Sequence, residues 1–261
     1  MSLVSNISRR SWAVWQRNKD VFFKTWKTNF LPPFLEPILY LLAMGFGFGM
    51  LIQELPPPWD VYSYAEFLGP GLIAISAMYG AFFECTYGSF VRMHYQKTFD
   101  AIVATPLTIE DVIAGEILWG ATKSFINATI VALVVAAFGL MSFPDFLVII
   151  PLTFLVGLMF GAIAMIFTAL VPNIDSFNYP FFLFITPMFL FSGTFFPLEI
   201  LPEVVQDIAM LLPLTHTTIL MRSFGLGVYG SIDAISLLYL VVLTVITFYA
   251  AIWMMRRRLV N

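Results

Sequence analysis

Residue types that commonly carry out catalysis are sparse in this chain and lie far apart. His94 and His216 are separated by three long apolar stretches, which place them on opposite sides of a membrane, where they cannot share a metal ion. There is no HExxH motif, and no lysine directly follows a glycine, which excludes the phosphate-binding GxxxxGK(S/T) loop. Cys85 is the single cysteine, so an intramolecular disulfide and a cysteine-based zinc site are both excluded. We therefore expect no catalytic, cofactor-binding or metal-binding residue on this chain.

Three ionisable residues, Glu84, Glu116 and Lys123, lie inside long apolar stretches. Each costs about 2.5–3.5 kcal/mol at the centre of a membrane helix, so each is expected to have a partner or a polar cavity. Glu116 and Lys123 are seven residues apart and therefore share one helix face. The sequence predicts a Glu84–Lys123 or a Glu116–Lys123 pair between neighbouring helices, and contact with substrate head groups is the alternative. Glu36, close behind Pro32-Pro33, is expected near the membrane surface.

The composition is that of a membrane protein. The chain has 261 residues, of which 60% are hydrophobic and 11% charged, with a formal net charge of -3. Soluble domains contain roughly 45–50% apolar and about 25% charged residues. A disordered chain requires low hydrophobicity, and a nucleic-acid-binding protein requires a basic surface. These three classes are excluded, and lipid is the expected solvent for most of the chain.

Six stretches are long and apolar enough to cross a bilayer, whose core of about 30 Å requires about 20 helical residues. Prolines mark several of their ends. The predicted spans are Phe34–Ile52, Phe67–Val91, Val112–Leu140, Phe146–Val171, Phe177–Phe196 and Ile232–Met255. The predicted fold class is an all-α membrane protein with one transmembrane domain over residues 32–261, preceded by a cytoplasmic segment over residues 1–31.

The distribution of charge predicts how the chain is oriented. Eleven of the 13 lysines and arginines lie before the first span, in the second loop or after the last span, whereas the first, third and fifth loops carry acidic residues. Positively charged loops stay cytoplasmic. Both termini are therefore predicted to be cytoplasmic, and Arg222 is expected in a loop on the opposite side.

Aromatic residues recur near helical spacing ahead of the first span, with basic residues between them. They are Trp12, Trp15, Phe22, Phe23, Trp26 and Phe30. This pattern is typical of an amphipathic helix that lies on the inner leaflet. The helix serves as an anchor only or also contacts a cytoplasmic partner, and the sequence leaves both functions open.

Another apolar stretch, Leu198–Leu212, is too short to cross the membrane, since it reaches about 22 Å at 1.5 Å per residue. We predict a short re-entrant or surface helix on the outer side, a turn at Pro213 and a second short helix over Thr217–Phe224. Short segments of this kind at membrane depth are covered by protein or line a cavity. The candidate residues of this re-entrant region are Pro197, Glu199, Pro202, Pro213 and His216.

The second loop, Arg92–Glu110, contains a segment that favours a helix, Thr98–Ala104, which Pro106 ends. Thr108 and Asp111 are spaced as an N-cap pair for the third span. A short helix held at the inner surface between two spans is suited to docking into a groove of a cytoplasmic partner. The alternative is a linker that is longer than most.

Two groups of residues resemble the ABC-2 type permeases, the membrane subunits of a class of ATP-driven exporters. The first comprises Phe83-Glu84, Arg92-Met93, Thr98, Ala101-Ile102, Pro106-Leu107-Thr108, Asp111, Gly115-Glu116, Trp119 and Lys123. The second comprises Ile185-Thr186-Pro187-Met188, Ser192-Gly193, Phe196-Pro197, Leu201-Pro202, Leu212-Pro213-Leu214 and His216. The similarity covers nearly the whole chain and, within the class, is greatest to rhizobial nodulation-factor permeases, which export lipo-chitin oligosaccharides.

The resemblance implies a non-enzymatic permease subunit of an ATP-binding cassette exporter in the bacterial cytoplasmic (inner) membrane. It implies a homodimer bound to two separate P-loop ATPase subunits, which would hold Mg-ATP. It also implies that Thr98, Phe99, Asp100, Ala101, Thr105, Pro106 and Leu107 couple the permease to the ATPase. Besides membrane lipid, the expected ligand is an amphiphile that resembles a lipo-oligosaccharide.

Other functions remain open at this point. Within the same family, the exported substrate could instead be a drug or a lipid-linked polysaccharide. A rival from another class is an ion-coupled secondary transporter, which needs carboxylates at the middle of the membrane and commonly shows inverted repeats. The sequence shows no clear repeat, and its fourth and fifth spans carry no charge.

Overall fold

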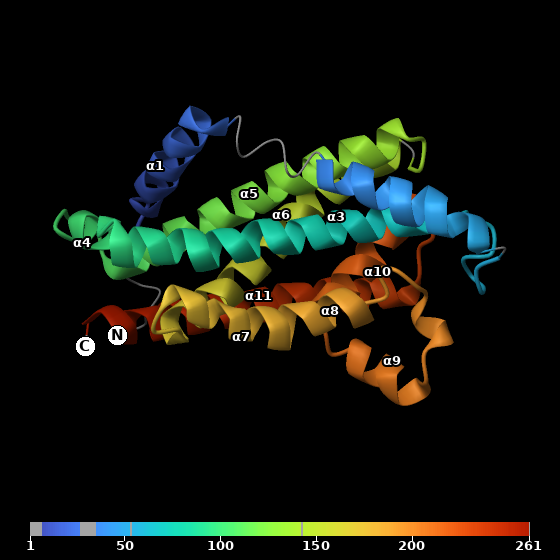
Figure 1. The fold of residues 1–261 in the computed structure, drawn as a ribbon. Coiled ribbons are helices and arrows are strands. Elements are labelled where there is room, and N and C mark those ends of the chain that lie inside the picture. Colours follow the sequence, from blue (N-terminus) through green and yellow to red (C-terminus); the bar gives the residue numbers. More distant parts are fainter. Residues whose placement is uncertain (1–6, 27–34, 53, 142, 261) are drawn as a thin grey trace.

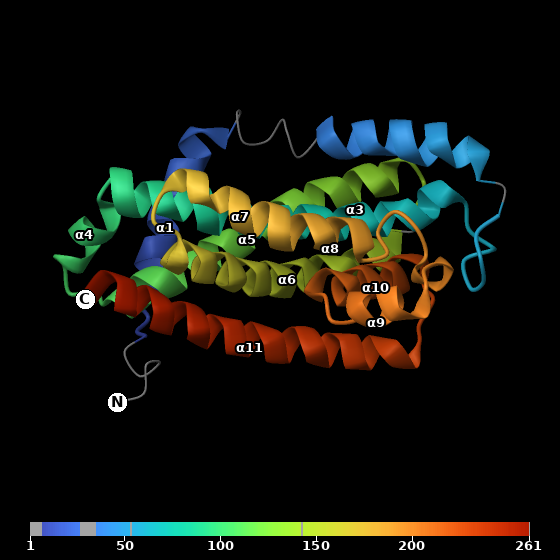
Figure 2. The same ribbon diagram turned by 60° about the horizontal axis from the view of Figure 1, so that its bottom comes forward.

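A computed structural model describes residues 7–26, 35–52, 54–141 and 143–260, except for the side chains of 143–146. The described chain is helical and contains no strand, which confirms the predicted all-α class. Four long helices form an elongated bundle in which α6 lies between α5 and α11 and α3 packs on both α5 and α6 (Figures 1 and 2). They are α3 (Tyr64–Phe83), α5 (Ile109–Ala137), α6 (Phe143–Leu170) and α11 (Ser231–Val260).

Shorter elements complete the bundle. They are α1 (Ser11–Lys24), η2 (Leu41–Gly47), η3 (Phe48–Leu51), η4 (Glu84–Gly88), η5 (Val91–Tyr95), α4 (Thr98–Val103), η6 (Ile174–Phe177), α7 (Asn178–Pro180), η7 (Phe181–Ile185), α8 (Thr186–Phe191), η8 (Leu198–Ile200), α9 (Glu203–Ala209) and α10 (Pro213–Leu226). We call the end of the bundle that carries α1, α4 and the C-terminus the basic end, because most of the arginines and lysines lie there (Figure 1).

Five helical segments of the described chain are long and apolar enough to cross a membrane. They are Tyr64–Tyr95, Ile109–Ala137, Leu147–Leu170, Ile174–Phe191 and Ser231–Val260. They correspond to the second through sixth predicted spans. The predicted first span is the shorter apolar helix Leu35–Leu51, and its predicted first residue, Phe34, lies outside the described residues.

Three predicted span ends lie four or more residues from the ends in the structure, and one of them is the sixth, which reaches Val260 rather than Met255. The second span does not end at Val91, because the helix continues through η4 and η5 to Tyr95 and places Arg92 inside the helix rather than in a loop. The fifth span ends at Phe191 instead of Phe196. The reason is Gly193, whose φ of +70° reverses the chain just beyond the C-cap.

Side-chain capping fixes where two of the long helices begin. The Ser63 side chain accepts a hydrogen bond from the Glu66 backbone N–H, and the Glu66 carboxylate accepts one from the Ser63 N–H in return. Thr108 and Asp111 form the same reciprocal pair at the start of α5, which confirms the N-cap predicted from their spacing. The cap places Asp111 and the following turn of α5 at the basic end.

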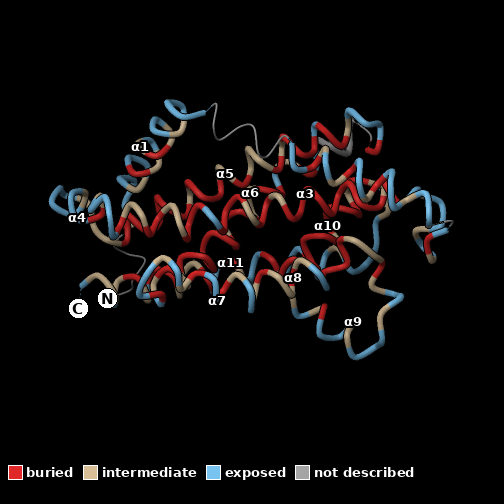
Figure 3. Tube along the Cα trace, viewed as in Figure 1, coloured by how far each residue is buried: buried red, intermediate tan, exposed pale blue. Residues whose placement is uncertain are grey.

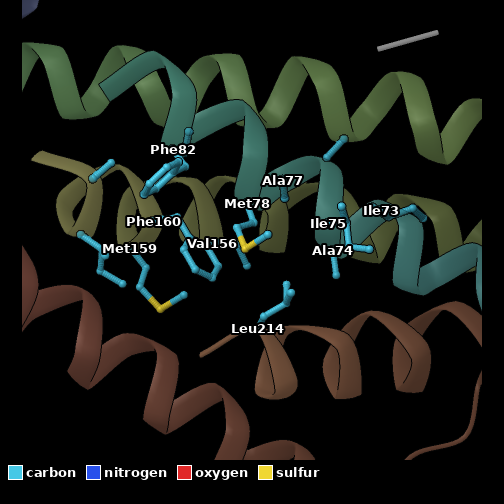
Figure 4. Packing of buried hydrophobic residues seen from close by; sticks show 14 of the residues in the cluster. Ile73, Ala74, Ile75, Ala77, Met78, Phe82, Val156, Met159, Phe160 and Leu214 are labelled. Atoms are coloured by element: carbon cyan, nitrogen blue, oxygen red, sulfur yellow. The ribbon is translucent and has the colours of Figure 1, made fainter. Parts of the chain in front are cut away.

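Buried residues line the sides of the long helices and of α10 that face one another (Figure 3), and many of these residues are apolar. In Figure 4, Met78 of α3 extends toward Leu214 of α10 and lies beside Val156 and Phe160 of α6. All four of these side chains are buried. Compared with exposure to water, burial of each such side chain contributes about 1.5–3 kcal/mol. Inside a membrane, the same close packing stabilises the bundle through van der Waals contacts.

Small residues bring α3, α5 and α6 into close contact. A Cβ atom at Gly157 would lie 2.8 Å from the Ala121 Cα, and one at Gly80 would lie 2.9 Å from the Ser124 Cα. Neither position has room for a larger side chain. Gly157 and Gly161, which are spaced as a GxxxG motif, therefore serve packing within the chain.

The two short helices predicted after the fifth span are present as α9 and α10, which meet at an angle of 90°. The second helix begins at Pro213 rather than Thr217, because proline at the first helical position has a suitable φ and needs no hydrogen-bond donor there. It extends to Leu226, and most of its side chains are buried against α3, α6 and α11. That this pair re-enters the membrane stays a prediction.

Candidate functional site

The intramembrane acids predicted to need partners belong to a buried charge cluster between α3–η5 and α5. Arg92 is its centre: one guanidinium nitrogen, Nη1, lies 2.7 Å from Glu84 Oε1, and Nη2 lies 2.6 Å from Glu116 Oε2. The Lys123 ammonium lies 2.7 Å from the other oxygen of Glu84. Ser89 donates a further hydrogen bond of 2.6 Å to Glu116. Two carboxylates and two cations compensate each other, as charges removed from water require.

The structure decides between the two pairs that the sequence left open. Glu84 binds Lys123 as predicted, whereas Glu116 binds Arg92 and not Lys123. The sequence predicted Arg92 in a loop and not in this cluster. Its spacing is the signal that could have placed it here, because Glu84, Gly88 and Arg92 lie at i, i+4 and i+8 on one helix face. In the structure, a Cβ at Gly88 would lie only 3.0 Å from Glu84 Oε1.

The N-terminal helix α1 is fastened to α5 and to this cluster. Asn18, which is buried, donates a hydrogen bond of 2.7 Å to Glu116 Oε1. Trp15 Nε1 donates one of 2.8 Å to Thr122 Oγ1. The Val14 side chain packs against Gly115, where a Cβ would lie 2.6 Å from the Val14 Cβ. One face of α1 is therefore fixed to the protein by directional contacts.

The other aromatic residues at α1 divide between the bundle and its outside. Phe22 packs edge-on against Trp119 of α5. Trp12 and Phe23 of α1 and Trp26, which follows it, are about half exposed or more, and Trp12 stacks on Trp15. Phe30 lies outside the described residues. One face of α1 is thus held against the bundle, and the other exposes aromatic side chains. Such a helix is suited to lie at the membrane surface, and this position of α1 stays a prediction.

The helix predicted as the docking element is present as α4, and its residues divide into two groups. Phe99 is buried and anchors the helix in the bundle, while Thr98 and Leu107 are half-buried. Asp100, Ala101, Thr105 and Pro106 are exposed, and they form the surface that α4 presents at the basic end.

Two arginines of the N-terminal segment hold this region in place. Arg10 Nη1 donates a hydrogen bond of 2.5 Å to the Pro106 carbonyl oxygen, and Arg17 Nη2 donates one of 3.4 Å to Thr98 Oγ1. Ser8 N–H also donates to Asp111 at the start of α5, at 2.6 Å. These contacts join α1, the α4 region and the start of α5 at the basic end.

The predicted re-entrant residues are not brought together with the charge cluster. His216 of α10 donates through Nε2 to the Met210 carbonyl oxygen at 2.9 Å, so Nδ1 accepts from Ser236 at 3.0 Å. The ring also stacks on Tyr239. These contacts join the α9–α10 turn to α11, which gives His216 a structural role. The other four predicted residues lie along the same turns, with Pro197 ahead of η8, Glu199 in η8, Pro202 at the N-cap of α9 and Pro213 at the first position of α10.

Arg222 corrects a sequence-based expectation, because it lies buried in α10 rather than in a loop. Its Nε donates to the Phe67 carbonyl oxygen at 3.2 Å, and its Nη2 donates to the Gly193 carbonyl oxygen at 2.9 Å. The guanidinium carbon lies 3.6 Å from the centre of the Phe67 ring. This arginine joins α10 to α3 and to the turn that follows α8.

Catalytic chemistry finds little support in this geometry. Across the described ranges, no three histidine, cysteine, aspartate or glutamate side chains come together as metal ligands would. The two buried carboxylates of the charge cluster, Glu84 and Glu116, form ion pairs with cations. The described chain is instead a bundle of long apolar helices with a compensated charge cluster, which is the architecture of a multi-pass membrane protein.

Comparison with known proteins assigns this architecture to a family. The family described as ABC-2 type transporter matches residues 9–226. The chain belongs to this family. It is 35% identical to Nodulation protein J of Sinorhizobium fredii over 95% of this chain and 94% of that protein. It is 36% identical to Nodulation protein J of Bradyrhizobium diazoefficiens with the same coverage, and 24% identical to the inner membrane transport permease YadH of Escherichia coli over 94% of each chain.

Proposed function

We propose that this chain is the membrane-spanning subunit of an ATP-binding cassette exporter, which moves an amphiphile from the cytoplasmic leaflet outward. Two copies of the chain would pair and bind two ATPase subunits that hydrolyse Mg-ATP. The basic end would face the cytoplasm of a bacterial cell, across its inner membrane, because positively charged loops stay on that side. An amphiphile related to a lipo-oligosaccharide is the substrate that the nodulation relatives favour.

The observation that carries this proposal is the set of contacts that hold α4 against the bundle. A helix of six residues has little stability of its own. Here it is held by the buried Phe99 ring and by hydrogen bonds from Arg10 and Arg17, while Asp100 and Ala101 stay exposed. A linker needs no such anchoring, whereas an element that receives force from a partner does.

The proposed mechanism follows from these contacts. When ATP closes the ATPase subunits, they push α4 toward the bundle, and the hydrogen bonds from α1 and the capped start of α5 move with it. The Arg92 guanidinium bridges α3–η5 and α5, so the two helices shift as one body rather than separately. Rocking of the two permease copies about their interface would then open the path outward. No proton-transfer residue is required.

Charge reversal at Asp100 tests the proposal. Asp100→Lys places a cation at the exposed surface of α4 and is expected to reduce both co-purification of the ATPase subunit and ATP-driven transport by about tenfold or more, a loss of about 1.4 kcal/mol of interaction. Asp207→Lys reverses an exposed acid of α9 at the other end and serves as the matched control. Unchanged association and transport in Asp100→Lys would contradict the assignment of α4.

The same assay addresses α1. Asp20, on α1, has the same side-chain exposure as Asp100, 68%, and likewise lies next to a lysine. If α1 only anchors the chain in the membrane surface, Asp20→Lys leaves ATPase binding unchanged. If α1 also contacts the ATPase, binding weakens as it does in Asp100→Lys.

The rival from another class, an ion-coupled secondary transporter, is favoured by one observation. Glu36 lies next to Tyr79 and Lys123 in a cavity at the middle of the bundle, and a carboxylate at that depth is what ion coupling needs. Proteoliposomes that hold this chain alone distinguish the two functions. An ion gradient drives transport in the rival, whereas the proposed exporter is inactive until the ATPase subunit and Mg-ATP are added.

A further inference from the structure

A cavity of about 430 Å³ lies between the first membrane helix, α3, α5 and η7. Each helix contributes one face to it: Ser76, Tyr79 and Phe83 come from α3, and Lys123 and Asn127 from α5. The cavity combines aromatic walls with a few polar groups, which is the usual composition of a small-molecule site. Tyr79 stacks on Phe181 of η7, so the aromatic wall continues across the helix boundary.

The cavity lies near the middle of the membrane. Tyr79 is halfway along the continuous Tyr64–Tyr95 helix, and Lys123 is at the midpoint of α5. Glu36 and Tyr40 of the first helix line the same cavity and therefore lie at this depth. The expectation that Glu36 stays near the membrane surface does not agree with this position, which is level with the midpoints of α5 and of the Tyr64–Tyr95 helix.

Glu36 leaves the cavity with a net negative charge. The Lys123 ammonium is bound by Glu84 and so is already compensated. Glu36 forms no hydrogen bond or ion pair with any other residue that the structure describes, and its side chain is exposed to the cavity and its opening. An unpaired carboxylate at membrane depth is unfavourable and by default marks a functional site. Its partner has to come from outside the described chain.

An apolar surface of the first helix adjoins the cavity. It comprises Leu35, Leu39, Ala43 and Met44 and shares Glu36 and Tyr40 with the cavity. All six of these residues belong to the first helix, so the surface is open rather than enclosed. A polar cavity next to an open apolar surface matches the two parts of an amphiphile.

We propose that the cavity and this surface bind one amphiphile, with its head group in the cavity against Glu36 and its acyl chain along the apolar surface of Leu35–Met44. The head group is uncharged and rich in hydrogen-bond donors, or it is cationic, because Glu36 accepts hydrogen bonds and attracts positive charge. Anionic heads such as phosphates are rejected by the same carboxylate. This inference rests on the proposed export function and specifies the substrate that it serves.

Three photoreactive probes test the site on the full chain in phosphatidylcholine nanodiscs. They share one dodecyl chain that carries a diazirine and differ in the head group: a glucoside, an ammonium or a phosphate. Mass spectrometry locates the labelled residues. We expect the glucoside and the ammonium to label residues 35–44 at concentrations about tenfold lower than the phosphate, the discrimination expected from a charge-assisted hydrogen bond.

Two variants distinguish the contribution of the Glu36 charge from that of the cavity volume. Glu36→Gln keeps the shape and removes the charge, and it is expected to abolish the preference for the ammonium over the phosphate. Glu54→Gln, an exposed acid in the loop after the first helix, is the matched control and keeps the preference. Ser76→Phe fills the cavity and lowers labelling by the glucoside and the ammonium alike by about tenfold, equivalent to 1.4 kcal/mol.

Several outcomes overturn the inference. One is equal labelling by the ammonium and the phosphate in the unaltered chain, and another is an unchanged preference in Glu36→Gln. If Glu36→Gln weakens self-association of the chain while labelling persists, Glu36 contacts a second copy and not a ligand. Because labelling needs no ATPase, a labelled surface in a chain that shows no ATP-driven transport would reject the export function and keep the site.

Discussion

Two regions of this molecule bury charged groups in different ways. The cluster around Arg92 balances two carboxylates, Glu84 and Glu116, with two cations. At Arg222 no carboxylate among the described residues lies within ion-pair distance, and the guanidinium is held by backbone carbonyl oxygens and by the Phe67 ring. One region stabilises its charges by opposite charge, and the other does so by dipoles and an aromatic face.

The two regions differ in what a substitution leaves behind. Removing Glu116 leaves the Arg92 guanidinium with one carboxylate in place of two. Removing Arg222 leaves backbone carbonyl oxygens, which carry no net charge. We therefore expect the cluster around Arg92 to be the more sensitive of the two to substitution.

The largest effect is expected from Glu116→Ala. It leaves Arg92 with one carboxylate and removes the acceptor of Asn18 and Ser89, so it should destabilise the chain by about 3–5 kcal/mol, the usual result of breaking a buried ion pair. Unfolding in detergent micelles measures this. The double variant Glu116→Gln with Arg92→Met removes both charges and should recover part of the loss. No recovery in that variant would mean that the cluster does not act as a charge pair.

Replacing Arg222 by methionine should cost less, about 2–3 kcal/mol, because it leaves carbonyl oxygens unsatisfied but no unpaired charge. The control is Arg257→Met, since Arg257 also lies over an aromatic ring, Trp253, but is exposed. The same unfolding assay applies. An effect of Arg222→Met equal to that of Glu116→Ala would remove the distinction between the two regions.

A smaller and more local effect is expected from Asn18→Ala, about 1–2 kcal/mol, because one hydrogen bond to a charged acceptor is lost. The change should appear as faster amide hydrogen exchange in α1, with little change in α3 or α6. Gln16→Ala, an exposed position on the same helix, is the control. Equal exchange in both variants would show that Asn18 does not hold α1.

The smallest effect on stability is expected from Asp100→Lys, less than about 0.5 kcal/mol, since the nearest cation, Lys97, is 4.0 Å away and both side chains are largely exposed. This variant should nevertheless lose ATPase coupling, as described above. A large drop in unfolding stability would instead show that the exposed surface of α4 contributes to the fold.

Local features of the sequence predicted much of this structure. The Thr108–Asp111 cap and the short helix that begins at Thr98 follow from spacing over a few residues. The cost of charge in an apolar stretch predicted a partner for Lys123, although it left open whether this is Glu84 or Glu116. Arg92 and Arg222 were misplaced for the same reason. A charged residue near the end of an apolar stretch is normally a loop residue, and only the partners brought by distant segments make its burial possible.

The sequence by itself determined the solvent, the helical class, the approximate spans and the absence of a P-loop motif, because hydropathy, proline positions and motif spacing are local properties. Tertiary structure decided which charge meets which. Asn18 meets Glu116 across 98 positions of sequence, and Glu36 reaches the cavity beside Lys123 only because the first helix packs at that depth. Such contacts depend on how helices pack against one another. The pattern of residue types along the chain does not specify this packing residue by residue.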